Sequence, residues 1–300
     1  MLAGKKCYLA GCGGMLGEAF YEELAPGNQV EASDKNPADP WLRPLDFRDA
    51  GAYAEAIRRF RPDYLFHLGA LTDLEYCETN PQEAMETNAQ AVETAVKLAN
   101  ENGCKLIYIS TAGIFDGKKE RYTEEDQPNP ISQYARTKYW GEMHVRQFSK
   151  DYLMCRPGWM MGGGPKKDKK FVRKIIDQIR QAKKTIHIVN DKMGTPTYTV
   201  DFARNCLHLL SMGKTGLYHM VCEGETSRLE VAKAILEFLP EGKNIRLEEV
   251  GSEFFANDYF APRPYSEILI NKKLQSEGLL RMRSWQEALA EYLNQKYSRT

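Results

Sequence analysis

Two residues of this sequence, Tyr134 and Lys138, have the types and the spacing that a proton-transfer site needs. If a helix carries them, both side chains lie on one face. A free tyrosine, with a pKa of about 10, is a poor acid at neutral pH. An ammonium nearby stabilises the phenolate and makes the phenol a better donor. Ser110 and Thr111 precede this pair and end a predicted strand, which adds a hydroxyl to the predicted site.

Glycines near the N-terminus follow the spacing G-x-x-G-x-x-G between an apolar strand at 6–10 and an amphipathic helix at 15–24. A tight strand-to-helix turn without Cβ atoms lets the backbone approach a pyrophosphate, and the helix N-terminus directs free N–H groups at it. The pattern therefore predicts a dinucleotide cofactor, NAD(H) or NADP(H). The predicted contacts in this turn are Gly11, Gly13, Gly14, Met15, Leu16 and Gly17.

Acidic residues follow the next two predicted strands. Asp34 ends the second strand, where a carboxylate hydrogen-bonds the adenosine ribose of NAD(H). Lys35 could equally attract the 2′-phosphate of NADP(H), so the choice between the two cofactors stays open. Asp46 and Phe47 follow the third strand and are expected beside the adenine, although Asp46 could instead cap the next helix.

Strand-like and helix-like stretches must alternate to hold these residues together. The predicted order of strands and helices is 6–10, 15–24, 29–32, 50–60, 64–68, 81–102 and 105–110. Such alternation predicts an α/β fold with helices on both faces of a parallel sheet. We expect a Rossmann-type, doubly wound parallel sheet with a smaller, interleaved C-terminal substrate domain.

The predicted domain boundaries follow from a change of composition after Gly158. The alternation of strands and helices stops there, and a stretch rich in glycine and lysine occupies 162–170. A helix at 199–210 and a strand at 216–221 then return to the earlier pattern. Two further helices are predicted at 228–239 and 284–296. The predicted NAD(P)-binding domain spans 1–158 plus about 187–222, and the predicted substrate domain spans about 159–186 plus 223–300.

Composition excludes several classes of function. The 41 basic residues balance the 41 acidic ones, so no charge pattern favours a nucleic acid or a membrane as partner. The first apolar run, at 7–10, is too short for the apolar core of a secretory signal, so we expect none, and the seven cysteines form no Cys-x-x-Cys pair. We therefore expect a cytoplasmic protein with reduced thiols. The five histidines form no metal-binding group, so no metal site is predicted.

Together the motifs resemble those of the dTDP-4-dehydrorhamnose reductase family of extended short-chain dehydrogenases, along nearly the whole chain. Beyond the turn and the Tyr134 segment, the similar stretches are 67–72 with Cys77, Glu78 and Asn88, then 115–117, 141–142, 156–159, 194–197, 216–219, 263–266 and 285–289. The resemblance implies NAD(P)H-dependent reduction of a 4-keto group on a nucleotide-activated deoxysugar, as in dTDP-rhamnose biosynthesis. It also implies a homodimer.

The resemblance further implies a catalytic set of Thr111, Tyr134 and Lys138. Tyr134 would give its proton to the new alkoxide, Thr111 would hydrogen-bond the same oxygen, and Lys138 would hold the nicotinamide ribose. The remaining implied cofactor contacts are Leu68, Gly69, Ala70, Thr72, Asn88 and Pro157, beside the Tyr134 and Lys138 already named.

On the substrate side we expect Leu74, Thr111, Trp159 and Arg263. Arg263 is a candidate phosphate contact because a guanidinium can bind two oxygens. Trp159 is either an aromatic platform for the substrate or a core residue. The lysines at 166, 167, 169 and 170 are either solvated or meet the substrate's diphosphate.

The sequence departs from the family after Thr111, where the usual Asp-Tyr-Val-Phe is replaced by Ala112, Gly113, Ile114 and Phe115. This removes two groups expected near the sugar and leaves its identity open. Two alternatives also stay open, because a fold does not determine a function. One is a nucleotide-sugar epimerase that retains NAD. The other is a non-catalytic regulatory subunit like the beta subunit of methionine adenosyltransferase.

Overall fold

The computed structural model describes residues 2–298, and a seven-stranded sheet lies at its centre. All neighbouring strands of this sheet are parallel, and β1 and β4 meet in the middle. In spatial order the strands are β12 (Gly216–His219), β7 (Tyr152–Arg156), β5 (Lys105–Ile109), β4 (Tyr64–His67), β1 (Lys6–Ala10), β2 (Gln29–Asp34) and β3 (Leu42–Pro44). This is the doubly wound order, in which a ligand binds beyond the carboxyl ends of the central strands.

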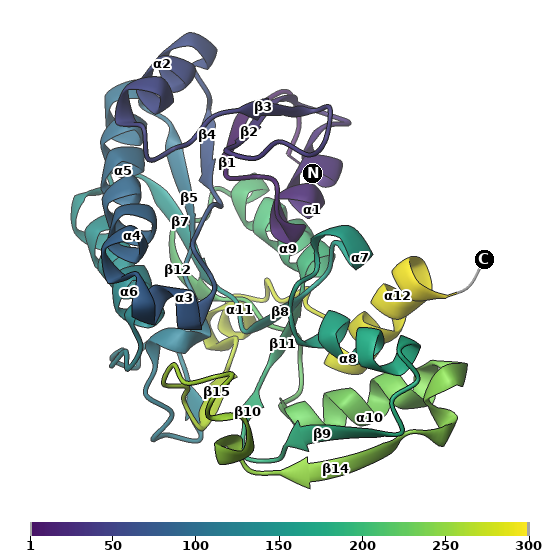
Figure 1. Cartoon of the computed structure of the whole chain (residues 1–300). Coiled ribbons are helices and arrows are strands. Elements are labelled where there is room, and N and C mark those ends of the chain that lie inside the picture. The colour runs from purple at the N-terminus through teal and green to yellow at the C-terminus, as the bar shows by residue number, and fades with distance from the viewer. Residues whose placement is uncertain (1, 299–300) are drawn as a thin grey trace.

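Helices cover both faces of the sheet, which is why its central strands are almost entirely buried. One face packs against α1 (Met15–Leu24) and α9 (Thr199–Ser211), and Phe20 meets Phe202 between these helices. The other face packs against α2 (Ala50–Phe60), α5 (Ala91–Asn102) and α6 (Gln133–Phe148). Figure 1 shows the two layers on either side of the sheet.

A smaller α/β layer, made largely of C-terminal residues, lies below the main sheet in Figure 1. Its two-stranded parallel sheet packs against α10, which also contacts α8 and α12. The elements of this layer are α8 (Phe171–Arg180), β9 (Thr185–Val189), α10 (Arg228–Phe238), β14 (Arg246–Val250) and α12 (Trp285–Tyr297).

Short elements lie between the two parts. The strands are β6 (Arg121–Tyr122), β8 (Trp159–Met161), β10 (Met193–Gly194), β11 (Pro196–Tyr198), β13 (Thr226–Ser227) and β15 (Ser266–Leu269). The short helices are α3 (Leu74–Thr79), α4 (Pro81–Met85), α7 (Gly164–Lys167) and α11 (Lys272–Ser276), with 3-10 turns at Ala112–Ile114, Pro240–Asn244 and Ser252–Phe255. Strand β8 pairs with β11, and β15 pairs with β10 and β6, so these short strands form the border at which the two parts meet.

The α/β fold and the doubly wound parallel sheet are confirmed. The helix expected at 81–102 contains a π-helical turn at Glu86–Gln90, between α4 and α5. Such turns are rare and occur often at functional sites. The division into two domains stays a prediction; β12 lies in the main sheet, whereas β9 pairs with β14 in the small one. No helix within residues 2–298 is long and apolar enough to cross a membrane.

Candidate active site

The glycine turn between β1 and α1 is closely packed on one side and open on the other. A Cβ on Gly11 would lie 2.3 Å from the Gly69 Cα, and one on Gly17 would lie 2.2 Å from the Cys12 carbonyl oxygen. Gly11 also has a φ of +72°. By contrast, a Cβ on Gly14 would meet nothing within 4 Å, and no side chain caps the helix that starts there. Gly14 thus presents free backbone N–H groups and open space to an anion.

Asp34 closes the far side of this turn. Its carboxylate accepts hydrogen bonds from the N–H of Gly13 at 2.9 Å and of Asn36 at 2.9 Å. A Cβ on Gly13 would collide with that carboxylate at 2.8 Å. Lys35 beside it is exposed. Asp34 is therefore held against the turn by backbone donors, at the end of β2, where the sequence analysis expected it.

Asp46 and Phe47 take different roles. Arg48 binds the Asp46 carboxylate through Nε at 3.0 Å, and this hydrogen bond is the main reason that the pKa of Asp46 is lowered. Arg48 also binds Glu83, which ties the segment to α4. Phe47 packs edge-on against His67, and a Cβ on Gly69 would collide with the Phe47 ring at 2.1 Å. The two residues thus border the loop that follows β4.

That loop is attached to both neighbouring elements. The N–H groups of Leu68 and Gly69 both donate to the Ala10 carbonyl. Asn88, in the π-helical turn, accepts from the Leu71 N–H at 2.8 Å and donates to the Leu71 carbonyl at 3.0 Å and to Thr137 at 3.2 Å. Asn88 is itself buried, so it fixes the loop rather than facing an open site. Ala70, Thr72 and Leu74 in and after this loop are half-buried.

Tyr134 and Lys138 lie in the first turns of α6. The helix begins there because the Ser132 hydroxyl accepts the Ala135 N–H at 3.2 Å, and Glu78 accepts the Gln133 N–H at 2.7 Å. Strand β5 ends beside them, and a Cβ built on Gly113 would lie 3.5 Å from the Thr111 Oγ1 and 3.8 Å from the Tyr134 Cε1, so the hydroxyl and the phenol ring border the same space. The structure therefore brings together all three residues of the predicted catalytic set.

The pKa values of Tyr134 and Lys138 differ from those expected for a tyrosine next to a charged lysine. Burial raises the pKa of Tyr134 to about 12, the Thr111 hydrogen bond opposes this, and Lys138 is not among the causes. Burial also lowers the pKa of Lys138 to about 7, with Glu142 opposing the shift. The expectation that Lys138 lowers the pKa of Tyr134 is wrong for this structure. A phenol that holds its proton across the neutral range is nonetheless suited to donate it.

A buried ion pair supports the catalytic helix from below. The guanidinium of Arg156, at the end of β7, binds the Glu142 carboxylate, and both side chains are fully buried. Ser110 donates to the same carboxylate at 2.7 Å, and His219 lies 3.1 Å from an Arg156 nitrogen. These contacts join β5, β7, β12 and α6 directly under Lys138. Pro157, next in the chain, is buried and accepts the Ala112 N–H at 2.9 Å.

Trp159 is half-buried on β8 at the border between the two parts, and two side chains that sequence analysis missed hold it. Its indole Nε1 donates to the Glu267 carboxylate at 2.8 Å, and the Arg228 guanidinium stacks on its ring at 3.7 Å. Arg228 also lies over Phe171, and it makes no ion pair with a carboxylate in residues 2–298. Burial is the main reason that the pKa of Arg228 falls to about 10. Neither residue stands in a motif, so no sequence signal could have found them.

Arg263, the arginine expected to bind phosphate, is already engaged. Its two terminal nitrogens bind the Glu75 carboxylate at 2.7 and 2.9 Å, and Glu75 lies on α3. A phosphate contact would therefore require this pair to open. The interpretation of the lysine run as solvated is also only partly right. Lys167 binds Asp39 at 2.7 Å, and Lys170 donates to the Thr72 hydroxyl at 3.0 Å, whereas Lys166 and Lys169 are exposed.

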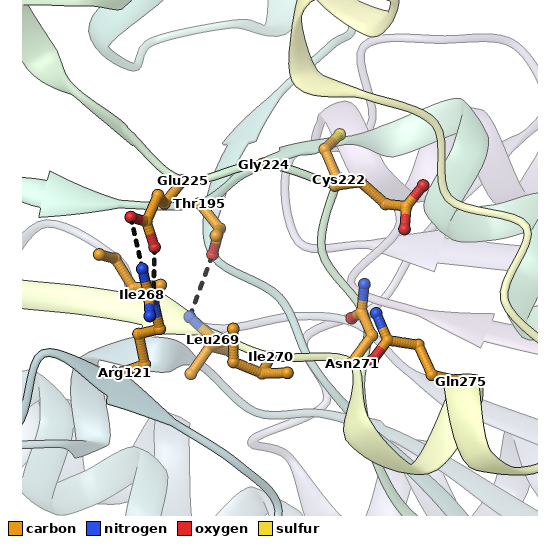
Figure 2. A pocket seen from close by; sticks show the side chains of 11 residues that line it. Arg121, Thr195, Cys222, Gly224, Glu225, Ile268, Leu269, Ile270, Asn271 and Gln275 are labelled. Atoms are coloured by element: carbon orange, nitrogen blue, oxygen red, sulfur yellow. Dashed lines mark hydrogen bonds and ion pairs between the residues drawn. The ribbon is translucent and has the colours of Figure 1, made fainter.

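A separate cavity of about 350 Å³ lies behind β15 and contains none of the catalytic set. Figure 2 shows the Arg121 side chain extending toward Glu225, with hydrogen bonds of 2.7 and 2.9 Å, and Asn271 and Gln275 at the other end. Thr195 and Glu223 also line the cavity, and the rest of its wall is Cys222, Gly224 and Ile268–Ile270. No group of three or more His, Cys, Asp or Glu side chains within residues 2–298 is placed to hold a metal ion.

Comparisons with known proteins cover almost the full length. The model of the RmlD substrate binding domain matches residues 5–298. Spore coat polysaccharide biosynthesis protein SpsK of Bacillus subtilis (strain 168) is 29% identical over 295 residues, 98% of each chain. The structure of dTDP-4-dehydrorhamnose reductase from Yersinia enterocolitica is 32% identical, with a TM-score of 0.87, covering 97% of this chain and 99% of that one. That of the Bacillus anthracis str. Ames reductase in complex with NADP is 28% identical, with a TM-score of 0.89, covering 98% and 100%.

Proposed function

The chain belongs to the RmlD substrate binding domain family, and on this premise we propose that it uses NAD(P)H to reduce a 4-keto group on a dTDP-activated deoxysugar. Relatives of full length are named dTDP-4-dehydrorhamnose reductases. The observation that carries the proposal is that the Thr111 hydroxyl and the Tyr134 ring border one space at the end of β5, at 3.5 and 3.8 Å from a Cβ built on Gly113, with Lys138 one helical turn away.

The glycine turn fits a dinucleotide. The N-terminus of α1, open at Gly14, would hold the pyrophosphate, and Asp34 would hold the adenosine ribose. Lys138 would meet the nicotinamide ribose. When bound, the reduced nicotinamide supplies the hydride. Because a relative binds NADP, both NADH and NADPH remain candidate cofactors for this chain.

The protein's own groups would handle the proton and the oxygen. Tyr134 carries a proton at neutral pH and is placed to give it to the developing alkoxide. Thr111 would hydrogen-bond the same oxygen and stabilise its charge. Trp159 would border the sugar. For the diphosphate we propose Arg228, because it is half-buried and its nearest charged partner, Glu267, acts on it without a direct ion pair, and we keep Arg263 as a second candidate.

The two alternatives make different demands on the site. A non-catalytic regulatory subunit has no use for a buried lysine beside a tyrosine and a threonine that border one space, so the arrangement of Thr111, Tyr134 and Lys138 favours an enzyme. An epimerase that retains NAD would use the same three groups. Net oxidation of the cofactor separates these functions, because an epimerase consumes none and a regulatory subunit shows neither reaction.

The experiment is to follow NADH and NADPH oxidation at 340 nm with dTDP-4-dehydrorhamnose and to identify the sugar product. We expect stoichiometric oxidation and a 4-hydroxyl product. Isomerised sugar without net oxidation would instead support the epimerase. Size-exclusion chromatography with light scattering tests the homodimer, and the cytoplasm is the compartment that we propose, in agreement with seven free cysteines.

A further inference from the structure

The Glu267 carboxylate lies beside the proposed reacting groups with one oxygen fixed and the other unoccupied. Glu267 is half-buried on β15, and its Oε2 accepts the Trp159 Nε1–H at 2.8 Å. Its Oε1 receives no hydrogen bond from any residue in 2–298. The two oxygens therefore differ: one holds an aromatic ring in place, and the other accepts no hydrogen bond in residues 2–298, although the charge of Arg228 acts on the carboxylate as a whole.

Gly113 determines what that free oxygen faces. A Cβ built on Gly113 would lie 3.5 Å from the Glu267 Oε1, 3.5 Å from the Thr111 Oγ1 and 3.8 Å from the Tyr134 Cε1. These are ordinary van der Waals distances, and Gly113 does not have a positive φ. The backbone thus does not require glycine here. The absent side chain leaves a space with the carboxylate on one side and the proton-donating pair on the other.

The chemistry of the three groups restricts the ligand. A keto oxygen can only accept, so it pairs with the donors Thr111 and Tyr134 and is repelled by an ionised carboxylate. Glu267 needs a donor, and a hydroxyl on the carbon next to the keto carbon reaches the neighbouring space when the keto oxygen is bound. A carbon without a hydroxyl would leave this half-buried oxygen desolvated and unpaired.

We propose that Glu267 determines specificity by accepting a hydrogen bond from the sugar hydroxyl adjacent to the keto carbon, in the space left by Gly113. This inference rests on the proposed function. Because hydrogen bonds to charged groups are about twice as strong as neutral ones, the 3-hydroxyl of a 4-keto sugar becomes a requirement of the site. A purely structural role, in which Glu267 only holds Trp159, is the alternative to exclude.

The test compares dTDP-4-dehydrorhamnose with its 3-deoxy analogue, using the full-length protein and its Glu267→Met variant. For the parent we expect kcat/KM to favour the hydroxylated sugar by about 10- to 100-fold. Glu267→Met should lose that factor on the hydroxylated sugar, in addition to the smaller loss that both sugars share because the Trp159 indole is released. Glu249→Gln, an exposed change on β14, is the control and should leave both values unchanged.

Trp159→Phe distinguishes the two roles of Glu267, binding of the sugar hydroxyl and positioning of Trp159, because it removes the indole N–H and keeps the Glu267 side chain. We expect it to lower kcat/KM for both sugars by similar factors and to keep the preference for the hydroxylated one. Equal losses on the two sugars in Glu267→Met, or a parent that does not distinguish them, would overturn the inference.

Calorimetric titration with the same two nucleotide sugars keeps this result separate from failure of the proposed function. If the parent turns over neither sugar, the reductase proposal fails. Tighter binding of the hydroxylated sugar, abolished by Glu267→Met, would then still support the role of Glu267. Equal binding of the two sugars, or binding of neither, would overturn that role as well.

Discussion

The Nζ of Lys138 donates a 2.7 Å hydrogen bond to the carbonyl oxygen of Ile109, the last residue of β5. The same nitrogen lies 4.4 Å from the centre of the Tyr108 ring. Lys138 is thereby joined to the strand that leads directly into Thr111. The contact fixes the position of the ammonium two residues before Thr111, on the same side of α6 as Tyr134.

The depressed pKa of Lys138 makes stability depend on pH. The folded pKa is about 7, below the ordinary value of 10.5, so between these values the unfolded chain binds more protons than the folded one. The contribution of this lysine to the free energy of unfolding should therefore rise with pH from about 7 to 10.5, by at most about 1.4 kcal/mol per pH unit.

Chemical denaturation of the cofactor-free protein at pH 7 and pH 9 measures this effect. We expect the parent to gain stability relative to Lys138→Met between these values. Lys97→Met is the matched control, because Lys97 lies exposed on α5, and its difference from the parent should not change with pH. A difference for Lys138→Met that is flat or falls as pH rises would contradict the lowered pKa.

Removing the phenol should stop the chemistry and leave the fold. Tyr134→Phe keeps the ring and removes the proton donor, so turnover should fall by about 10²–10⁴-fold, while NAD(P)H binding by fluorescence titration and the melting temperature stay close to those of the parent. Tyr139→Phe, on the same helix, is the control, since its hydroxyl bonds only Gln127. Turnover of Tyr134→Phe within a few-fold of the parent would exclude the proposed proton donor.

The parts of the site that lie at strand ends could be predicted from sequence. The positions of Gly11, Asp34 and Thr111 follow from a parallel sheet, because each residue directly ends or follows a strand and the carboxyl ends of these strands meet. The Tyr134 and Lys138 pair follows from helical spacing. These residues are local in sequence to the elements that position them.

Glu267 and Arg228 could not be predicted in this way. Each reaches Trp159 only because β15 and α10 pack against β8 from more than sixty residues away in sequence. The hydrophobic periodicity of a strand or helix does not predict a contact between residues so far apart in sequence. The predicted lowering of the Tyr134 pKa was wrong for a related reason. The spacing of Lys138 reveals a nearby charge, whereas the cost of burial, which depends on the whole fold, determines the pKa of Tyr134.

A side chain at Gly113 should change kcat/KM for dTDP-4-dehydrorhamnose. The family resemblance and the proposed role of Glu267 predict changes in opposite directions. The resemblance implies that Gly113→Tyr restores a group usual in the family and raises reduction of dTDP-4-dehydrorhamnose. The proposed role of Glu267 implies a fall in kcat/KM of about tenfold or more, because the ring would occupy the space for the hydroxyl. We expect the fall, measured by steady-state kinetics.

The backbone at Gly113 accepts a side chain, since a Cβ there makes only ordinary contacts, and the melting temperature of the variant checks that the larger ring is also accommodated. The neighbouring change, Ala112→Asp, differs because Ala112 is buried among Ile114, Phe115 and Leu269. An unpaired carboxylate there should destabilise the protein by at least about 3 kcal/mol. The single variant is therefore the informative one, and a gain in kcat/KM for it would refute the role given to Glu267.

Cofactor preference tests the place of Asp34. A carboxylate at the ribose accepts hydrogen bonds from both hydroxyls and repels a 2′-phosphate, whereas exposed Lys35 attracts that phosphate. We expect NADH to bind at least as well as NADPH, and Asp34→Ala to weaken NADH more than NADPH. Lys35→Ala should weaken NADPH alone. Strong preference of the parent for NADPH in a fluorescence titration would mean that Asp34 does not bind the ribose.

Two glycines of the turn should respond in opposite ways to the same added methyl group. At Gly17 the new Cβ would lie 2.2 Å from the Cys12 carbonyl oxygen, so Gly17→Ala should push α1 away from β1 and cost about 1–3 kcal/mol or more in unfolding free energy. At Gly14 the Cβ meets nothing within 4 Å, and the φ of −85° suits alanine. Gly14→Ala should therefore keep or slightly raise stability.

The same methyl group at Gly14 would stand where the pyrophosphate must approach the backbone. Gly14→Ala should thus weaken NAD(P)H binding by about tenfold or more, a loss of about 1.4 kcal/mol, in a protein that melts no earlier than the parent. Thermal unfolding with and without cofactor measures both effects, because a bound cofactor stabilises the folded protein by an amount that grows with the logarithm of the cofactor concentration divided by Kd. If Gly14→Ala binds cofactor as the parent does, the pyrophosphate does not lie against this turn, and the assignment of the whole N-terminal site fails with it.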